Sequence, residues 1–143
     1  MSVAAALGSS FGRGYGPRLK LDWSLGAFAD RETGDISPLF VFFDARNTGS
    51  IEAELVHLSV EVKGRRLDLT DHLGGERDLP CKLAPGEATR FWLRARDLAN
   101  KLKDEGQTGG PRVKLVVEDK LGNEYAKRFR FRVDQYLLLK DEG

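Results

Sequence analysis

The residues of this chain best suited to chemistry are two histidines and one cysteine, His57, His72 and Cys81. None of them stands in a CxxC, HxH or HExxH arrangement, the spacings that let a short segment converge on a metal. A cysteine nucleophile would need a neighbouring base in an electropositive pocket, and no motif in the sequence organises one. We therefore expect Cys81 to be a small buried hydrophobic residue, His72 to lie in an exposed loop, and His57 to be solvated on a strand.

Other segments could in principle carry chemistry. Glu52 and Glu54, or Glu61, could form a carboxylate pair for hydrolysis, but acidic residues at outward strand positions are usually solvated. The glycine-rich stretch GSSFGRGYG lacks the Lys-Ser/Thr pair of a P-loop and the strand-to-helix context of a dinucleotide fingerprint. The sequence therefore predicts no enzyme, no catalytic, cofactor-binding or metal-binding residue, and no cofactor.

Basic residues gather near the end of the chain. Residues 110–133 carry seven basic and three acidic side chains, a local charge of +4 in a chain whose net charge is +1. If a turn places Asp119 opposite Asn123, like charges face each other across a hairpin, which is destabilising unless something offsets it. We call this set the basic ladder, and it consists of Arg112, Lys114, Arg128, Arg130 and Arg132. Either it binds an anionic partner, or an acidic residue such as Glu61 or the acidic tail neutralises it.

A second surface candidate is apolar. Phe40, Phe42 and Trp92 fall on the strand phase opposite the expected core. Aromatic residues on an outward face are typical of a partner surface. The alternative is that another part of the chain, the leader or the YLLL tail, covers them.

Most of these residues fall in segments with the pattern of β-strands. Alternating apolar and polar residues predict seven to eight short strands with turn signals between them, which is typical of an antiparallel sandwich. The expected strands are residues 19–25, 39–46, 55–62, 65–69, 79–83, 88–94, 112–117 and 125–133. One segment has helical spacing instead, with Asp97 as the N-cap, Leu98 and Leu102 one turn apart, and Gly106 after the end.

Length and composition limit the class of protein. A chain of 143 residues with 41% hydrophobic and 31% charged residues suits one domain with a core, and excludes collagen-like, disordered and membrane-spanning classes. A single cysteine without a signal-peptide pattern favours a cytoplasmic location. We expect a glycine- and serine-rich leader over residues 1–17, a β-sandwich over 18–134, and a tail over 135–143. A net charge of +1 also argues against indiscriminate binding to nucleic acid.

Three turn motifs connect the expected strands. They are Asn47-Thr48-Gly49, Leu83-Ala84-Pro85-Gly86-Glu87, whose Pro85-Gly86 fits a type II turn, and Asp119-Lys120-Leu121-Gly122-Asn123. With these turns in this order, residues 18–134 resemble immunoglobulin-like or fibronectin-type sandwich domains of bacterial proteins. The chain lacks the cysteine pair that joins the two sheets of antibody-type domains.

The resemblance implies an all-β, antiparallel immunoglobulin-like β-sandwich with one short connecting helix and no catalytic activity. The resulting hypothesis is a non-catalytic protein-interaction or assembly module, whose partner is another protein or a second copy of the chain. Its contact surface would be Phe40, Phe42 and Trp92. The alternative is a domain that binds an anionic polymer, nucleic acid or acidic glycan, through the basic ladder, with nucleic acid the less favoured ligand.

Overall fold

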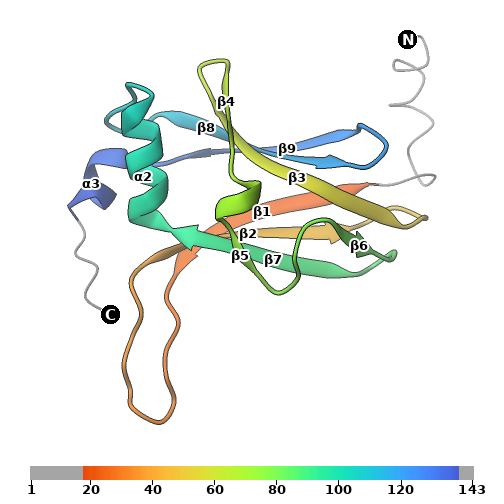
Figure 1. Cartoon of the computed structure of the whole chain (residues 1–143), viewed down its shortest axis with the longest axis horizontal. Coiled ribbons are helices and arrows are strands. Elements are labelled where there is room, and N and C mark those ends of the chain that lie inside the picture. The colour runs from red at the N-terminus through yellow and green to blue at the C-terminus, as the bar shows by residue number, and fades with distance from the viewer. Residues whose placement is uncertain (1–17, 139–143) are drawn as a thin grey trace.

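The computed structural model describes residues 18–138, and the expected leader and residues 139–143 lie outside this range. The described chain is mostly β, as the sequence predicts, and its strands form two antiparallel sheets (Figure 1). The first sheet has the order β1-β2-β7-β5. Its strands are β1 (Leu19–Gly26), β2 (Phe40–Asn47), β7 (Ala88–Arg94) and β5 (Gly74–Gly75).

The second sheet has the order β4-β3-β8-β9, and one further strand, β6, pairs with β3. Its strands are β4 (Arg65–Asp68), β3 (Ala53–Val62), β8 (Arg112–Asp119), β9 (Glu124–Arg130) and β6 (Cys81–Leu83). A 3-10 turn, η1 (Thr70–His72), precedes β5, and two α-helices, α2 (Ala95–Asp104) and α3 (Val133–Leu137), complete the described chain. Within it, no helix is long and apolar enough to cross a membrane.

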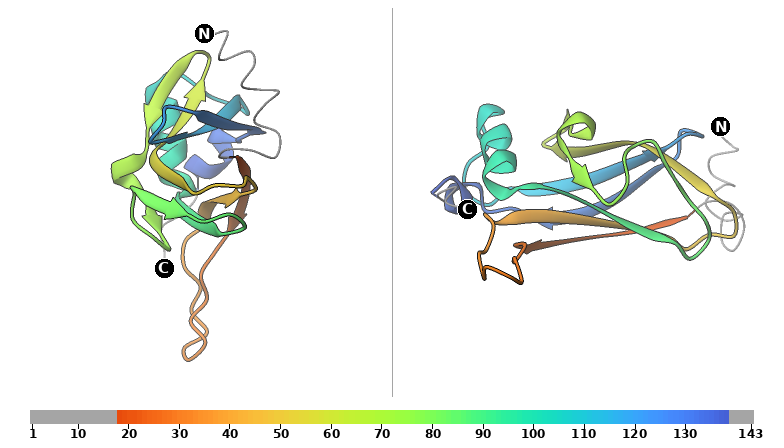
Figure 2. Two further views of the ribbon diagram at one scale, coloured as in Figure 1. Left: turned by 90° about the vertical axis from the view of Figure 1, so that its right-hand side faces the viewer. Right: turned by 60° about the horizontal axis from the view of Figure 1, so that its bottom comes forward.

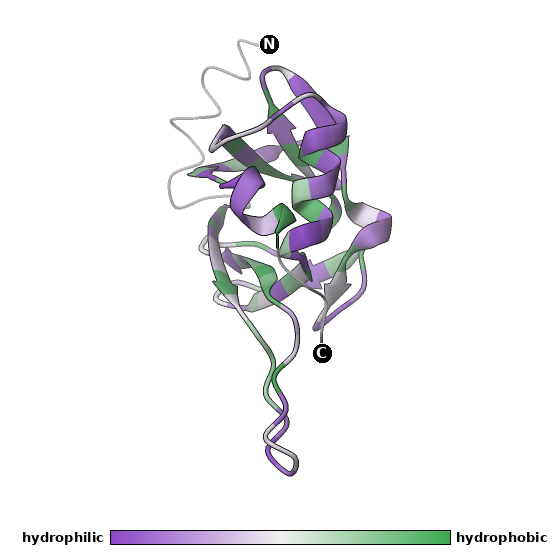
Figure 3. Ribbon diagram, turned by 90° about the vertical axis from the view of Figure 1, so that its left-hand side faces the viewer, coloured by the Kyte–Doolittle hydropathy of each residue, from purple (hydrophilic) through white to green (hydrophobic). Residues whose placement is uncertain are grey.

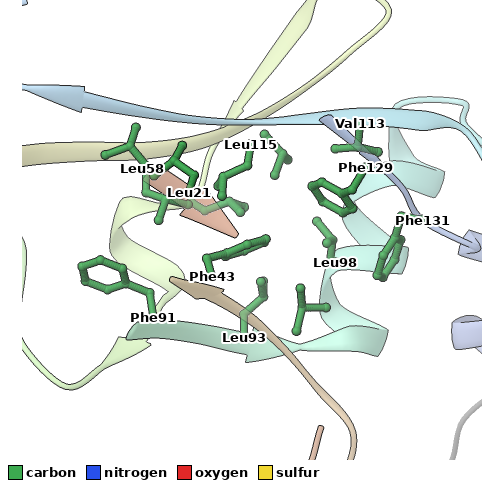
Figure 4. Close-up of a cluster of buried hydrophobic side chains, with 14 of the residues drawn as sticks. Leu21, Phe43, Leu58, Phe91, Leu93, Leu98, Val113, Leu115, Phe129 and Phe131 are labelled. Atoms are coloured by element: carbon green, nitrogen blue, oxygen red, sulfur yellow. The ribbon is translucent and has the colours of Figure 1, made fainter. Parts of the chain in front are cut away.

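The hydrophobic core lies between the two sheets (Figure 4). Phe43 from β2 and Phe129 from β9 approach each other across it with ring centroids 6.1 Å apart, and Trp23 from β1 stacks on Phe129 at 4.7 Å. Helix α2 closes one end by burying Leu98 and Leu102 completely. Burying a side chain of this size contributes about 1.5–3 kcal/mol, so these contacts between layers hold the sheets together.

The helical segments differ from the sequence prediction in their bounds. Helix α2 begins at Ala95, and Asp97 lies in its first turn instead of capping it. The buried Ala95 extends the apolar face by one turn, which outweighs the preference of Asp97 for the cap. The predicted left-handed glycine after the helix is confirmed, because Gly106 has φ +80°.

The last expected strand also ends early. Strand β9 stops at Arg130, and residues 133–137 form α3 across the boundary expected between domain and tail. Tyr136 is buried and its ring lies 4.7 Å from that of Phe131, at the end of the core near α2. The apolar residues of this segment thus lie on α3 and pack against the end of the hydrophobic core.

Strand β3 departs from strict alternation. Leu55 pairs with Asp119 while His57 pairs with Glu118, so Val56 is an extra residue at a β-bulge. Strict alternation with the inward Leu58 would place Val56 inward and Leu55 outward, and at this position that prediction is wrong. Leu55 is completely buried and Val56 only partly, because the bulge shifts the register by one residue and turns the preceding side chains to the other face.

Two of the turn motifs rest on buried polar side chains. Asn47 is completely buried, and its Nδ2 donates to the carbonyls of Ile51 and Leu83, each at 2.8 Å. The Asp119 carboxylate, 2% exposed, accepts hydrogen bonds from the Asn123 backbone at 2.9 Å and the Tyr125 hydroxyl at 3.0 Å. Burial and this hydrogen bond raise the pKa of Tyr125.

The third motif forms the predicted type II turn. The Glu87 amide donates to the Ala84 carbonyl at 2.9 Å, and Gly86 has φ +84°, a conformation that favours glycine. The Glu87 side chain accepts from the Ala84 amide at 2.9 Å and from Arg77 at 2.6 Å. These contacts lower the pKa of Glu87 to about 2, with the Arg77 hydrogen bond as the largest cause.

Candidate interaction surfaces

A two-stranded loop projects from the sandwich between β1 and β2 (Figures 1 and 2). We call residues 27–38 the arm. Its two sides are joined by a bridge between Ala29 and Ile36 and by two hydrogen bonds between Phe28 and Ser37, of 2.7 and 2.8 Å. Asp30 closes the end, since its carboxylate accepts from the Glu32 amide at 2.8 Å. The arm is therefore internally hydrogen-bonded along its length.

Phe28 fastens the base of the arm to the outer face of the first sheet. Its ring makes edge-on contacts with Phe40, Phe42 and Trp92, at centroid distances of 5.2, 5.4 and 5.2 Å. We call these four residues the aromatic cluster. Edge-on aromatic pairs contribute about 0.5–1.5 kcal/mol each beyond their buried area, so the cluster fixes where the arm begins.

The residues expected to form an apolar surface do lie together on this outer face. Phe42 is only 6% exposed, however, while Phe40 and Trp92 are half-buried. Of the described residues, Phe28 is the one whose ring covers them. The Arg90 guanidinium lies 4.9 Å from the centre of the Phe42 ring. The accessible apolar groups of this region are therefore Phe28, 44% exposed, and Ile36, 63% exposed, on the arm.

Sequence reasoning missed Phe28 because it falls next to the polar stretch DRETGD, which reads as a loop. The available signal is a lone aromatic residue at the edge of a polar loop that connects to a strand with two outward aromatic residues. The aromatic cluster also depends on Gly74 of β5, which pairs with Trp92. A Cβ atom there would lie 2.2 Å from the Trp92 indole nitrogen, so only glycine admits the indole.

The basic ladder forms in the predicted register. Arg112 faces Arg130 and Lys114 faces Arg128 across β8 and β9, and the Asp119 amide donates to the Asn123 carbonyl at 3.0 Å. The side chains of Arg112, Arg128, Arg130 and Arg132 are exposed. Lys114 is half-buried.

Neutralisation of the ladder is partial. Glu61 on the neighbouring β3 lies 3.3 Å from the Lys114 ammonium and 2.9 Å from Arg66. Hydrogen bonds from Arg66 and then Lys114 lower the pKa of Glu61. Arg66 also pairs with Glu124 at 2.7 Å. Within residues 18–138, the four ladder arginines make no ion pair with an acidic residue, and Asp134 is the carboxylate that borders the hollow beside Arg130 and Arg132.

Two shallow hollows adjoin the exposed arginines. One lies beside the turn after β3 and is bordered by four basic residues and one carboxylate, namely Lys63, Arg112, Lys114, Arg128 and Glu61. The other lies at the far end of the ladder and is bordered by Arg130, Arg132 and the acidic Asp134, with Gly109 and Gly110. The surface around the ladder thus contains shallow hollows into which a partner's side chains could fit.

The three chemically competent residues lie on separate elements. Cys81 is buried on β6, where burial raises the pKa of its thiol, and His57 is exposed on β3. His72 lies on η1 at the edge of a polar hollow that also contains Asp97 and Asp104 of α2. The described part of the chain holds no group of three histidine, cysteine or carboxylate side chains placed to bind a metal ion.

Comparison with known proteins finds similar solved structures but no matching sequence family. No family model matches the chain, and no curated protein matches it. Among solved structures, it is similar to a Bordetella pertussis protein described as ApaA, at 13% identity and a TM-score of 0.40, over 82% of this chain and 95% of that one. It is also similar to the X-ray structure of a structural genomics target, at 12% identity and a TM-score of 0.39, over 93% of this chain and 97% of that one.

Proposed function

We propose that the chain is an immunoglobulin-like β-sandwich that acts as a non-catalytic protein-interaction or assembly module. Strand order supports the fold assignment. In immunoglobulin-type domains strands A, B and E lie in one sheet and strands C, F and G in the other. Here β1, β2 and β7 occupy the first set of positions, and β3, β8 and β9 the second.

The anchored arm is the observation that carries the function. Ordering a residue costs about 1–2 kcal/mol in backbone entropy, yet residues 27–38 add no side chain to the core cluster. The aromatic cluster and the internal hydrogen bonds offset part of this cost. A projecting element that is held in one conformation before binding loses little further entropy on contact, which suits it to recognition of a partner.

Paired substitutions test this role. Replacing Phe28→Ser and Ile36→Ser removes the exposed apolar groups of the arm. A control pair, Leu121→Ser with Leu138→Ser, removes two apolar side chains elsewhere that are more exposed than those of the arm, at 73% and 83%. We expect the arm pair to reduce association, measured by light scattering and by capture of tagged partner chains, at least about tenfold more than the control pair. Equal behaviour of the two pairs would refute the proposal.

The aromatic residues of the sheet give a second readout. Phe40→Ser with Phe42→Ser should reduce association through loss of the arm's anchor while circular dichroism still reports a β-sandwich. Because Phe42 is nearly buried, a loss of stability of about 1–3 kcal/mol is also expected. Complete unfolding would instead show that this face belongs to the core.

The four exposed arginines favour one alternative function, binding of an anionic polymer. Heparin and a single-stranded oligonucleotide are suitable probes. Neutralising several phosphates or sulfates makes affinity fall steeply with salt, so an affinity that changes little between low and high salt would exclude this function. The oligonucleotide is the weaker candidate, because Phe129 and Phe131 are buried and cannot stack on bases.

A further inference from the structure

The end of the arm is acidic. Residues 30–35, which we call the acidic tip, contain Asp30, Glu32 and Asp35 against the single basic Arg31, a net charge of −2. All of these side chains are exposed, and none of them makes an ion pair with another described residue. Hydropathy changes along the arm from hydrophobic at its base to hydrophilic at its end (Figure 3). The acidic tip therefore exposes negative charge to solvent at the end of the hydrogen-bonded arm.

The acidic tip and the basic ladder point away from each other within one molecule. The arm leaves the sheet that contains β1 and β2, whereas the ladder lies on the outer face of β8 and β9 in the other sheet, and both figures place these on opposite sides (Figures 1 and 2). Phe28 holds the base of the arm on its own sheet. The tip thus cannot reach the ladder of the same chain.

We propose that the acidic tip of one copy binds the basic ladder of a second copy. This inference rests on the proposed function and names its partner. The tip carries −2 and the exposed arginines of the ladder carry +4, and such complementarity speeds encounter and fixes orientation. The hollow beside Arg128 is lined by Lys63, Arg112 and Lys114 as well as Glu61, so its basic residues outnumber its one carboxylate and favour the tip's carboxylates.

A contact of this kind joins two different surfaces, so it is heterologous. Each copy that binds through its arm keeps a free ladder, and each copy that binds through its ladder keeps a free arm. Such contacts build open chains, or rings where the rotation between copies closes. The weight-average mass should therefore rise with concentration beyond that of a dimer, and fall as salt screens the charges.

Charge reversal on each side tests the proposal in the full chain. The ladder variant is Arg128→Glu, Arg130→Glu and Arg132→Glu. The tip variant is Glu32→Lys and Asp35→Lys, which changes the tip from −2 to +2 and leaves Asp30 to close the turn. The control variant reverses three exposed lysines on other surfaces, Lys82→Glu, Lys103→Glu and Lys120→Glu.

Sedimentation velocity at about 50 mM and about 500 mM salt gives the readout. The wild type should assemble at low salt and dissociate at high salt. Each reversed variant alone should assemble at least roughly tenfold more weakly, because its tip and ladder then repel. An equimolar mixture of the two should regain assembly, since each tip again meets a ladder of opposite charge. The control variant should assemble like the wild type despite the same change in net charge as the ladder variant.

Several outcomes would overturn this inference and leave the proposed function standing. A wild type that is monomeric at every concentration and salt level would do so, because the arm could still bind another protein. Loss of heparin binding in the ladder variant with unchanged self-assembly would identify a polyanion site instead. A need to remove residues 139–143 before copies associate would identify the chain's own tail as the occupant. Circular dichroism checks the fold of each variant, and Arg128→Gln with Arg130→Gln provides a milder change.

Discussion

At the scale of single residues, a few buried polar groups determine the turns. Asn47 and Asp119 each stand at the end of a strand, and each satisfies several backbone groups that would otherwise be left unpaired in a buried turn. A buried polar group without a partner costs about 1–3 kcal/mol, so these residues matter through the groups that depend on them.

The substitution Asp119→Ala tests this dependence. It removes the carboxylate to which the Tyr125 hydroxyl and the amides of Leu121 and Asn123 donate. We expect the free energy of unfolding to fall by about 2–4 kcal/mol in urea denaturation. The neighbouring Glu118→Ala, which is half-exposed, should change it by less than about 1 kcal/mol. Similar losses in both variants would show that the buried carboxylate has no special role.

The pKa of Glu87 predicts a pH dependence at the type II turn. Its folded value of about 2 lies below the ordinary 4.5, so folding favours the ionised carboxylate. The resulting stabilisation is complete above about pH 4.5 and is lost as the pH falls toward about 2. The difference in melting temperature between the wild type and Glu87→Gln should therefore be constant from pH 7 to about 5 and shrink below that range. A difference that stays constant down to pH 2.5 would contradict this assignment.

At the scale of elements, the arm and the bulge in β3 show how local patterns can mislead. The arm reads as a polar loop, but one aromatic side chain turns it into a fixed projection. The bulge at Val56 interrupts an alternation that looks continuous and brings Leu55 into the core. In both cases the position of a segment depends on what it meets in the neighbouring layer or strand.

Fluorescence of Trp92 reports on the anchor of the arm. In a Trp23→Phe background, Trp92 is the remaining tryptophan. Phe28→Ala removes the ring that lies 5.2 Å from it, so the indole becomes more hydrated. We expect the emission maximum to shift to longer wavelength and quenching by iodide to increase. Ile36→Ala, farther along the arm, should leave both unchanged, and an unshifted spectrum in Phe28→Ala would show that the contact is not maintained in solution.

At the scale of the whole molecule, charge is divided between opposite sides. The chain has a net charge of +1, yet it combines a tip of −2 with four exposed arginines across the sandwich. An even distribution would give neither side a preferred partner. Because negative charge lies at the arm and positive charge on the opposite side, copies can align with the tip of one on the ladder of the next. This arrangement is the proposed head-to-tail assembly.

The like charges of the ladder make a prediction about stability. Arg130 faces Arg112 directly and has Arg128 and Arg132 as neighbours on its own side. Arg130→Glu replaces repulsion by attraction, so the free energy of unfolding should rise by about 0.2–1 kcal/mol at low salt and the gain should shrink at high salt. Arg130→Gln should give a smaller gain of the same sign. A loss of stability would show that the ladder is already neutralised within the fold.

Local alternation and turn residues were enough to predict most strand segments, the three turns and the register of the last hairpin, but not β5, the bulge in β3 or the early end of β9. They also determined the like-charge pairs of the ladder, which follow from that register. The sequence named Glu61 as one residue that could neutralise the ladder, and the packing of β3 beside β8 places it on Lys114. The contact of Phe28 with Phe42, and the position of the tip and the ladder on opposite sides, follow from packing alone. These relations join residues distant in sequence through the packing of layers, and periodicity along one strand carries no information about which side chain the next layer or loop will supply.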